Sequence, residues 1–153
     1  MLNDTLTYEK RIRYSDRKSN INEYVVGIAV FSNHKLLIVR RSPHDYLGGF
    51  FELPGGNVDN DSFETTVQQE LFEETGLSVK SIINWFTGFI YQTGKNTVRQ
   101  CNCLVKASSN PVKLNSAEHD NYKWINKSEI NNHKMTPQMR KCIKEAFKIY
   151  ENL

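Results

Sequence analysis

The sequence predicts an α+β layered domain, and three observations support this. Two pairs of β-branched and aromatic runs, each interrupted by a short polar turn, are typical of β-hairpins. Two other segments repeat apolar residues at helical spacing and predict two helices. With 153 residues, the chain has the length of one domain that can bury a sizeable core.

The first hairpin is expected at residues 24–41, YVVGIAVFSNHKLLIVRR, where the polar residues 32–35 supply the turn. Residues 42–61, SPHDYLGGFFELPGGNVDND, hold four of the eight glycines and two of the four prolines, so we predict a loop there. We expect the domain to span residues 21–153. The polar and charged residues 1–20 would form an N-terminal extension.

A helix should follow the loop and begin at Asp61. The Asp61 carboxylate can accept hydrogen bonds from the N–H groups of the first turn, and Glu64 lies three residues later as the partner in a capping box. Gly76 suits the left-handed conformation that often ends a helix. A buried stripe is expected at every fourth position: Phe63, Val67 and Leu71.

The second half of the chain predicts a further hairpin and a C-terminal helix. Residues 79–92 and 97–107 have strand character and are joined by a glycine-containing turn at 93–96. A short strand is predicted at 122–125 and a helix at 137–150. The apolar positions of this helix share one face: Met139, Ile143, Ala146, Phe147 and Tyr150.

Composition excludes several classes of protein. The hydrophobic fraction is 39%, and no apolar run approaches the roughly 20 residues of a bilayer-spanning helix. The N-terminus lacks the apolar segment of a secretory signal, so we expect a cytoplasmic protein. The net charge of +3 gives no reason to expect specific nucleic-acid binding. We interpret Cys101, Cys103 and Cys142 as reduced packing residues, because no disulfide framework or zinc-ligand spacing is present.

Three glutamates carry the strongest chemical signal. On a helix, Glu70, Glu73 and Glu74 fall within a sector about 100° wide, so their carboxylates can converge. They repel one another and lie at the helix C-terminus, where the macrodipole disfavours anions. A hard divalent cation such as Mg²⁺ would relieve both penalties. The alternative is a solvated acidic face, but the upstream Gly-Gly turn and the buried stripe favour a site.

Residues 54–77, PGGNVDNDSFETTVQQELFEETGL, resemble the signature of the Nudix hydrolase (MutT-like) family, Gly-x5-Glu-x7-Arg-Glu-U-x-Glu-Glu-x-Gly-U with U aliphatic. Two departures concern Gln69, where the family has Arg, and Asp61, where it has Glu. The loop from Gly56 is also one residue shorter than usual. The residues that match are Glu70, Leu71, Glu73, Glu74, Gly76 and Leu77.

The resemblance implies a Nudix-type α/β/α sandwich with a mixed β-sheet. It also implies that Glu70, Glu73 and Glu74 bind Mg²⁺, or Mn²⁺ in its place, and act in catalysis. The general base would be Glu118 or Glu70.

Four further residues are candidates for the substrate site. The backbone of Gly55 or Gly56 would lie beside the metal and the substrate, as the resemblance implies. Arg40 and Arg41 end the second strand of the first hairpin, so one points to each face and could meet a phosphate. Both could equally be solvated charges at the end of a strand.

The expected function is Mg²⁺-dependent cleavage of a pyrophosphate bond in a nucleoside diphosphate linked to another group. A nucleoside triphosphate, normal or oxidised, is the first substrate candidate and a nucleotide sugar the second. The alternative is a non-catalytic nucleotide-binding or regulatory module, because Gln69 and Asp61 weaken the match. A third reading makes the basic stretches 10–18 and 134–148 a surface for RNA. A homodimer is left open.

Overall fold

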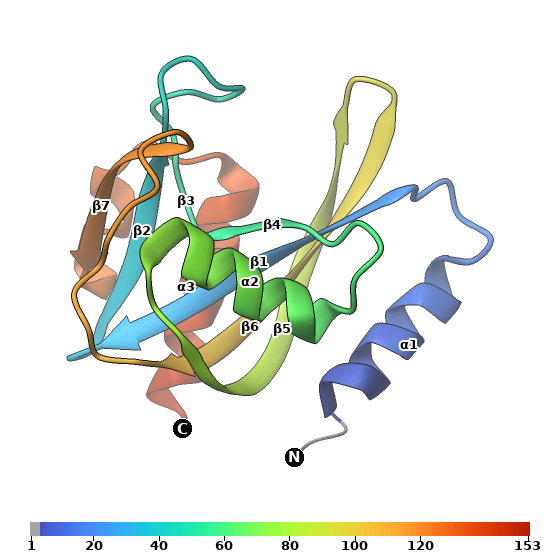
Figure 1. Cartoon of the computed structure of the whole chain (residues 1–153), viewed down its shortest axis with the longest axis horizontal. Coiled ribbons are helices and arrows are strands. Elements are labelled where there is room, and N and C mark those ends of the chain that lie inside the picture. Colours follow the sequence, from blue (N-terminus) through green and yellow to red (C-terminus); the bar gives the residue numbers. More distant parts are fainter. Residues whose placement is uncertain (1–3) are drawn as a thin grey trace.

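The computed structural model describes residues 4–153 and shows a mixed β-sheet between helices (Figure 1). The sheet has seven strands, and its main path runs in the order β3-β2-β1-β6-β5. In chain order the elements are α1 (Asp4–Asp16), β1 (Glu23–Ser32), β2 (Lys35–Arg41), β3 (Phe51–Glu52), β4 (Gly55–Asn57), α2 (Phe63–Thr75), β5 (Val79–Thr93), β6 (Asn96–Ala107), β7 (His119–Ile125), the 3₁₀ helix η1 (Lys127–Asn132) and α3 (Pro137–Glu151).

Strand β1 connects two parts of the sheet. Its first half pairs with β4, with Val26 opposite Gly56, and its end pairs with β2, with Phe31 opposite Leu36. On its other side β1 runs parallel to β6, whereas every other strand pair is antiparallel. Strand β7 extends the sheet beyond β2. Strand β1 therefore has two antiparallel neighbours and one parallel neighbour, which confirms the mixed sheet that the sequence resemblance implied.

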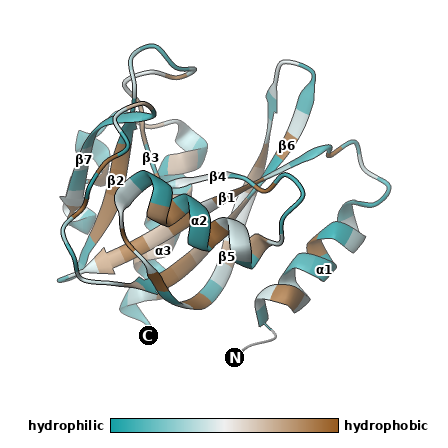
Figure 2. Cartoon of the chain, viewed as in Figure 1, coloured by the Kyte–Doolittle hydropathy of each residue, from teal (hydrophilic) through white to brown (hydrophobic). Residues whose placement is uncertain are grey.

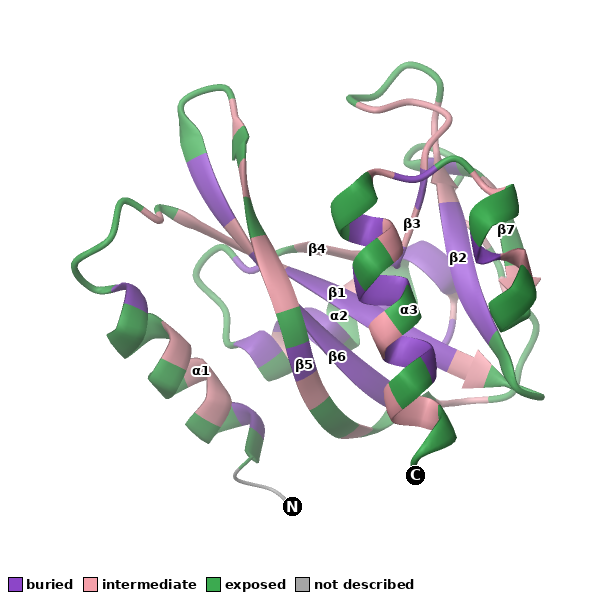
Figure 3. Cartoon of the chain, turned by 180° about the vertical axis from the view of Figure 1, so that it is seen from behind, coloured by how far each residue is buried: buried purple, intermediate pink, exposed green. Residues whose placement is uncertain are grey.

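Helices cover both faces of the sheet, because the side chains of the central strands alternate between two cores. In β2, Ile38 packs in the core under α3, whereas its neighbour Leu37 packs in the core under α2. Figure 3 shows the buried central strands behind α3, and Figure 2 shows hydrophobic residues concentrated on these strands. The α/β/α arrangement is confirmed.

Both predicted hairpins and the C-terminal helix are present. The turn of the first hairpin is Asn33 and His34, and the second hairpin turns at Gly94 and Lys95. On α3, four of the five expected stripe residues are buried, and Tyr150 at the end is half-buried. Helix α2 ends as predicted at Gly76, which has φ of 73°.

Two details of the prediction are wrong. Helix α2 is capped by Ser62, whose hydroxyl accepts a hydrogen bond from the Thr65 N–H at 3.1 Å, while Asp61 is exposed one residue earlier. The predicted loop at 42–61 contains strands β3 and β4. Strand β4 escaped prediction because glycine has low strand propensity. Here it is required, since a Cβ on Gly55 would lie 1.8 Å from the carbonyl oxygen of Val26.

The N-terminal helix α1, which the sequence did not predict, packs beside α2 and β5 (Figure 1). Tyr8 stacks on Trp85 with ring centroids 4.6 Å apart. The Asp16 carboxylate accepts a hydrogen bond from Arg99 Nε at 2.6 Å. Most of the segment expected as an extension is therefore an ordered part of the fold.

All three cysteines are buried and free, which confirms that they are packing residues. Between residues 4 and 153, no helix has the length and apolar character needed to cross a bilayer.

Candidate functional site

A cavity of about 850 Å³ opens where β1 connects the two parts of the sheet. Its wall is built from the first half of β1, the end of β2 with the loop that follows it, β3, β4, the C-terminal half of α2, the β5–β6 hairpin, the start of β7 with the segment before it, and the start of α3. Pockets for small ligands usually have volumes of about 300–1,000 Å³, so a nucleotide-sized molecule fits the space. Glu70 and Glu74 of the predicted set lie in the wall of this cavity.

Helix α2 presents these two carboxylates because its apolar stripe is buried. Leu71 and Val67 are inaccessible to solvent, so the helix cannot rotate about its axis. Glu70 then lies against β4, where a Cβ added to Gly56 would approach the Glu70 Cδ to 2.4 Å. The Gly55 N–H donates to Glu74 Oε1 at 3.3 Å. The two glycines of the predicted site thus allow the strand and the glutamates to approach each other closely.

The electrostatic environment of these two glutamates is unfavourable for negative charge. Burial, followed by the charges of Glu73 and Glu118, raises the pKa of Glu70 to about 7. Burial, followed by the charge of Glu52, raises the pKa of Glu74 to about 10. A nearby cation would stabilise the ionised forms of both groups.

Glu73 occupies a different position. Its side chain is exposed and does not line the cavity, although its charge acts on Glu70. Gln69 and Asp61, the two residues that depart from the family signature, are also exposed. The predicted metal-binding set therefore divides into two glutamates in the cavity wall and one exposed glutamate outside it.

A buried network that the sequence analysis missed connects Glu74 to the opposite wall. His119 Nδ1 lies 3.4 Å from Glu74 Oε2, and His119 Nε2 lies 3.0 Å from Glu52 Oε2. Glu52 in turn accepts from Arg41 Nη1 at 3.1 Å. Nothing local in the sequence marks these residues as a group, but Glu52 lies just before the glycine turn and His119 directly follows Glu118.

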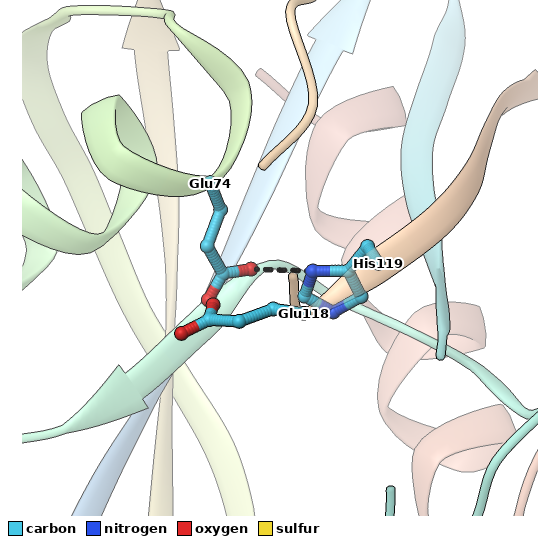
Figure 4. Close-up of side chains that lie close together, drawn as sticks. All are labelled: Glu74, Glu118 and His119. Atoms are coloured by element: carbon cyan, nitrogen blue, oxygen red, sulfur yellow. Dashed lines mark ion pairs between the residues drawn. The ribbon is translucent and has the colours of Figure 1, made fainter. Parts of the chain in front are cut away.

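Glu118 joins Glu74 and His119 in one cluster (Figure 4). One ligand atom from each residue can be chosen so that all three lie within 4.8 Å of one another. Glu118 itself is exposed and lines the cavity, so it can reach a bound substrate or ion. The structure brings Glu118 to the two glutamates of α2 from a segment more than 40 residues away in the chain.

The two arginines differ in position. Arg41 lines the cavity, and its Nε donates to the carbonyl oxygen of Tyr46 at 2.6 Å. Arg40 is not in the cavity wall and forms a two-bond ion pair with Asp120, at 2.7 and 3.1 Å. Alternation along β2 thus separates the two side chains, as expected from the sequence.

Aromatic residues on or next to the strands of this region could stack on a nucleotide base, but only some of them border the cavity. Phe51 is buried yet borders the cavity, and the partly buried Phe50 and Tyr91 line it. Tyr122 and Trp124 on β7 do not contribute to the cavity wall. The two basic stretches lie on α1 and α3, which pack on opposite faces of the sheet, so they do not form one continuous surface for RNA.

The residues in this site fit a divalent cation. Glu74 Oε2 and His119 Nδ1 are buried and have no hydrogen-bond partner among the described residues. Both atoms are ligand types for divalent metals, and Glu70 and Glu118 supply further oxygens nearby. The arrangement can hold a cation beside a nucleotide-sized cavity.

The structural comparisons agree on the fold. The MutT protein from Methanosarcina mazei Go1 has a TM-score of 0.72 and 22% identity, with 88% of this chain and 99% of that chain covered. The Nudix domain of Shewanella oneidensis NrtR, solved in complex with ADP ribose, has a TM-score of 0.71 and 20% identity, with 94% and 97% covered. The MutT Nudix hydrolase from Burkholderia pseudomallei has a TM-score of 0.67 and 19% identity, with 82% and 95% covered.

The sequence comparisons give the family. No curated protein matches the chain. A model of the Nudix domain matches residues 22–146, which is most of the chain. Together with the fold shared with the MutT proteins, this match shows that the chain belongs to the Nudix family.

Proposed function

We propose that the chain is a Nudix pyrophosphohydrolase that uses Mg²⁺, or Mn²⁺ in its place, to cleave a nucleoside diphosphate linked to another group. The observation that carries this proposal is the position of Glu70 and Glu74. Both line a cavity of about 850 Å³ and lie against the two glycines of β4. The family match over residues 22–146 supports it.

Each residue of the site has a role in this proposal. Glu70, Glu73 and Glu74 would hold the cation, with the backbone of Gly55 and Gly56 beside it. A divalent cation, when bound, neutralises the diphosphate charge and lowers the pKa of a water molecule.

The remaining roles concern the proton and the phosphates. Glu118 would accept the proton of the attacking water, with Glu70 as the alternative base. Of the two arginines, Arg41 is the better phosphate contact, because it lines the cavity while Arg40 is paired with Asp120 outside it.

The substrate we favour is a nucleoside triphosphate, including an oxidised one, and a nucleotide sugar is the second candidate. The cavity wall carries aromatic rings that could stack on a base, among them Phe50 and Tyr91. It also carries amides that could hydrogen-bond to base edges, among them Gln92, Gln100 and Gln138.

Phosphate release across a panel of nucleoside triphosphates and nucleotide sugars, with Mg²⁺ and then with Mn²⁺, tests the proposal. The double variant Glu73→Gln/Glu74→Gln should lose at least about 100-fold in kcat/KM. Glu64→Gln is the matched control, because Glu64 lies exposed on the first turn of the same helix and outside the cavity. An unchanged rate in the double variant would exclude the proposed role of these glutamates.

The alternative is a nucleotide-binding module without turnover, and Gln69 and Asp61 are the residues that favour it. The Shewanella domain was solved with ADP ribose, so this compound is a suitable probe. A rise in melting temperature with ADP ribose, without phosphate release from any compound of the panel, would support the binding module over the hydrolase.

We also propose that the protein acts in the cytoplasm, either as a monomer or as a homodimer. Light scattering coupled to size-exclusion chromatography would determine the oligomeric state, since one chain has a mass of 17.8 kDa.

A further inference from the structure

His119 lies between the carboxylates of Glu52 and Glu74. The ring is buried, and Nε2 lies 3.0 Å from Glu52 Oε2. On the other side, Nδ1 faces Glu74 Oε2 at 3.4 Å. Neither of these two atoms has a hydrogen-bond partner among residues 4–153.

The distance between these atoms suits an ion between them. They are 3.4 Å apart, whereas a hydrogen bond to a charged group would draw them to about 2.7–2.9 Å. A metal ion at about 2.1 Å from each atom would subtend an angle of about 108°, close to tetrahedral. The side chains are only 5% and 3% exposed, so water does not freely satisfy these atoms.

The surroundings of His119 are those of a metal-binding histidine. In such sites, the ring nitrogen that does not bind metal usually donates to a carboxylate, which fixes the ring and raises its basicity. Here Glu52 is that carboxylate, and Arg41 holds Glu52 in turn at 3.1 Å. On the other side, the Gly55 N–H holds Glu74 Oε1 and leaves Oε2 for His119.

We propose that His119 Nδ1, Glu74 Oε2 and a carboxylate oxygen of Glu118 form a nitrogen-containing metal site that favours a first-row transition-metal ion over Mg²⁺. Figure 4 shows the three side chains together, with a dashed line for the ion pair between His119 Nδ1 and Glu74 Oε2. The inference deepens the proposed function, on which it rests for the use of a cation. It adds two ligands from outside α2, His119 and Glu118, and a different class of metal. With Glu118 bound to the metal, Glu70 is the base of the proposed reaction.

The chemistry of the ligands gives the selectivity. Mg²⁺ prefers oxygen ligands in octahedral geometry and keeps several of its waters. Imidazole nitrogen suits ions such as Co²⁺ and Zn²⁺, whose affinity for nitrogen and oxygen sites exceeds that of Mn²⁺. A site with one imidazole and two carboxylates therefore binds Co²⁺ more tightly than Mg²⁺.

Calorimetric titration of the full chain with Co²⁺ alone and with Mg²⁺ alone, without nucleotide, tests the proposal. The wild type should bind Co²⁺ at least about 10-fold more tightly than Mg²⁺. Loss of a residue that only supports a metal-binding histidine costs about 10–100-fold in metal affinity. His119→Gln removes the histidine itself, so it should weaken Co²⁺ binding by at least that factor. Mg²⁺ affinity should change much less. His44→Gln is the matched control, because His44 is exposed and outside the cavity wall.

A second readout identifies the ligand directly. The visible absorption of bound Co²⁺ depends on ligand type, so the spectrum of the wild type should change in His119→Gln and remain the same in His44→Gln. Glu52→Gln should keep the fold and still weaken Co²⁺ binding, because it removes the charge that orients His119. A thermal melt in EDTA shows whether each variant is folded before metal is added.

Three results would overturn the proposal. Equal affinity of the wild type for Co²⁺ and Mg²⁺ would exclude the preference. An unchanged Co²⁺ spectrum in His119→Gln would exclude the nitrogen ligand. Equal loss of both metals would make His119 a positioning residue for Glu74. Because all readouts use metal alone, failure of hydrolysis would be seen separately in the substrate panel.

Discussion

Replacing Gly56 with alanine should damage the site while leaving the fold intact. The added Cβ would lie 2.4 Å from the Glu70 Cδ, and 2.5 Å and 2.8 Å from its two carboxylate oxygens. Ordinary contact requires 3.4 Å or more, so the carboxyl group must move away by about 1 Å. A displacement of this size at a catalytic group can cost about 100-fold in rate.

The stability cost of this change should be small for the same geometric reason. The atoms in conflict are the end of a side chain that is only partly buried and can change rotamer. We therefore expect the free energy of unfolding of Gly56→Ala to lie within about 1 kcal/mol of the wild-type value. Its kcat/KM should fall about 100-fold. Steady-state phosphate release and urea denaturation of the same preparation measure the two quantities.

Two other glycine variants serve as comparisons. In Gly55→Ala the Cβ would meet the backbone oxygen of Val26 at 1.8 Å, and a backbone atom cannot move aside, so this variant should lose stability first. In Gly94→Ala the added Cβ meets no atom within 4 Å, and Gly94 itself does not line the cavity, although its neighbours Thr93 and Asn96 do. Because φ is 56°, the change should cost some stability, but it does not displace Glu70 and should retain activity. Full activity in Gly56→Ala would refute the argument that glycine is needed at position 56 to leave room for the Glu70 carboxyl group.

Three further predictions concern other parts of the molecule. Asp16→Asn should lower the free energy of unfolding by about 2 kcal/mol at pH 7, because Asp16 accepts from Arg99 Nε at 2.6 Å. Arg99 holds the pKa of Asp16 below its ordinary value of 3.8, so this stabilisation is present above that pH, and urea denaturation should show it disappearing as the pH falls further. Glu9→Ala should cost about 1 kcal/mol in thermal unfolding, because Glu9 Oε1 accepts from the Phe63 N–H at 2.8 Å at the start of α2. Without divalent cations, stability should fall as pH rises from about 4.5 to 7, because the folded protein holds the pKa of Glu70 at about 7, above its ordinary 4.5, and so binds more protons than the unfolded chain. Glu70→Gln should flatten this dependence, and Mg²⁺ should restore stability at the upper end.

The parts of the fold that the sequence predicted are those with a local pattern. Phe63, Val67 and Leu71 repeat every four residues, and each is inaccessible to solvent on α2. The hairpins likewise have their turn residues between two apolar runs. Helix α1 has no such pattern, because most of its residues are polar and its few packing contacts, such as Tyr8 on Trp85, are made with distant residues.

The same distinction applies to the site. Glu70, Glu73 and Glu74 share one turn of helix, so their helical spacing makes them a candidate group. The network around His119 joins residues of β3, α2 and β7, which meet only after the sheet has formed. The spacing of residues along the chain contains no information about such a meeting. The spacing also does not predict which of the three side chains is exposed. In the structure Glu73 is exposed, whereas Glu70 is partly buried and Glu74 is buried.

The N-terminal helix α1 contacts α2, the helix that carries the glutamates of the proposed site, although the two helices are far apart in sequence. Glu9 accepts a hydrogen bond from the first residue of α2, and Tyr8 lies 6.2 Å from the Phe63 ring at the same end of that helix. The other end of α2 carries Glu70 and Glu74, and the buried side chains of the helix extend from its first turn to its last. A rigid helix that is held at its start is held at its end as well. We therefore expect the contacts of α1 to contribute to the orientation of the two carboxylates, although none of the described residues of α1 lies in the cavity wall.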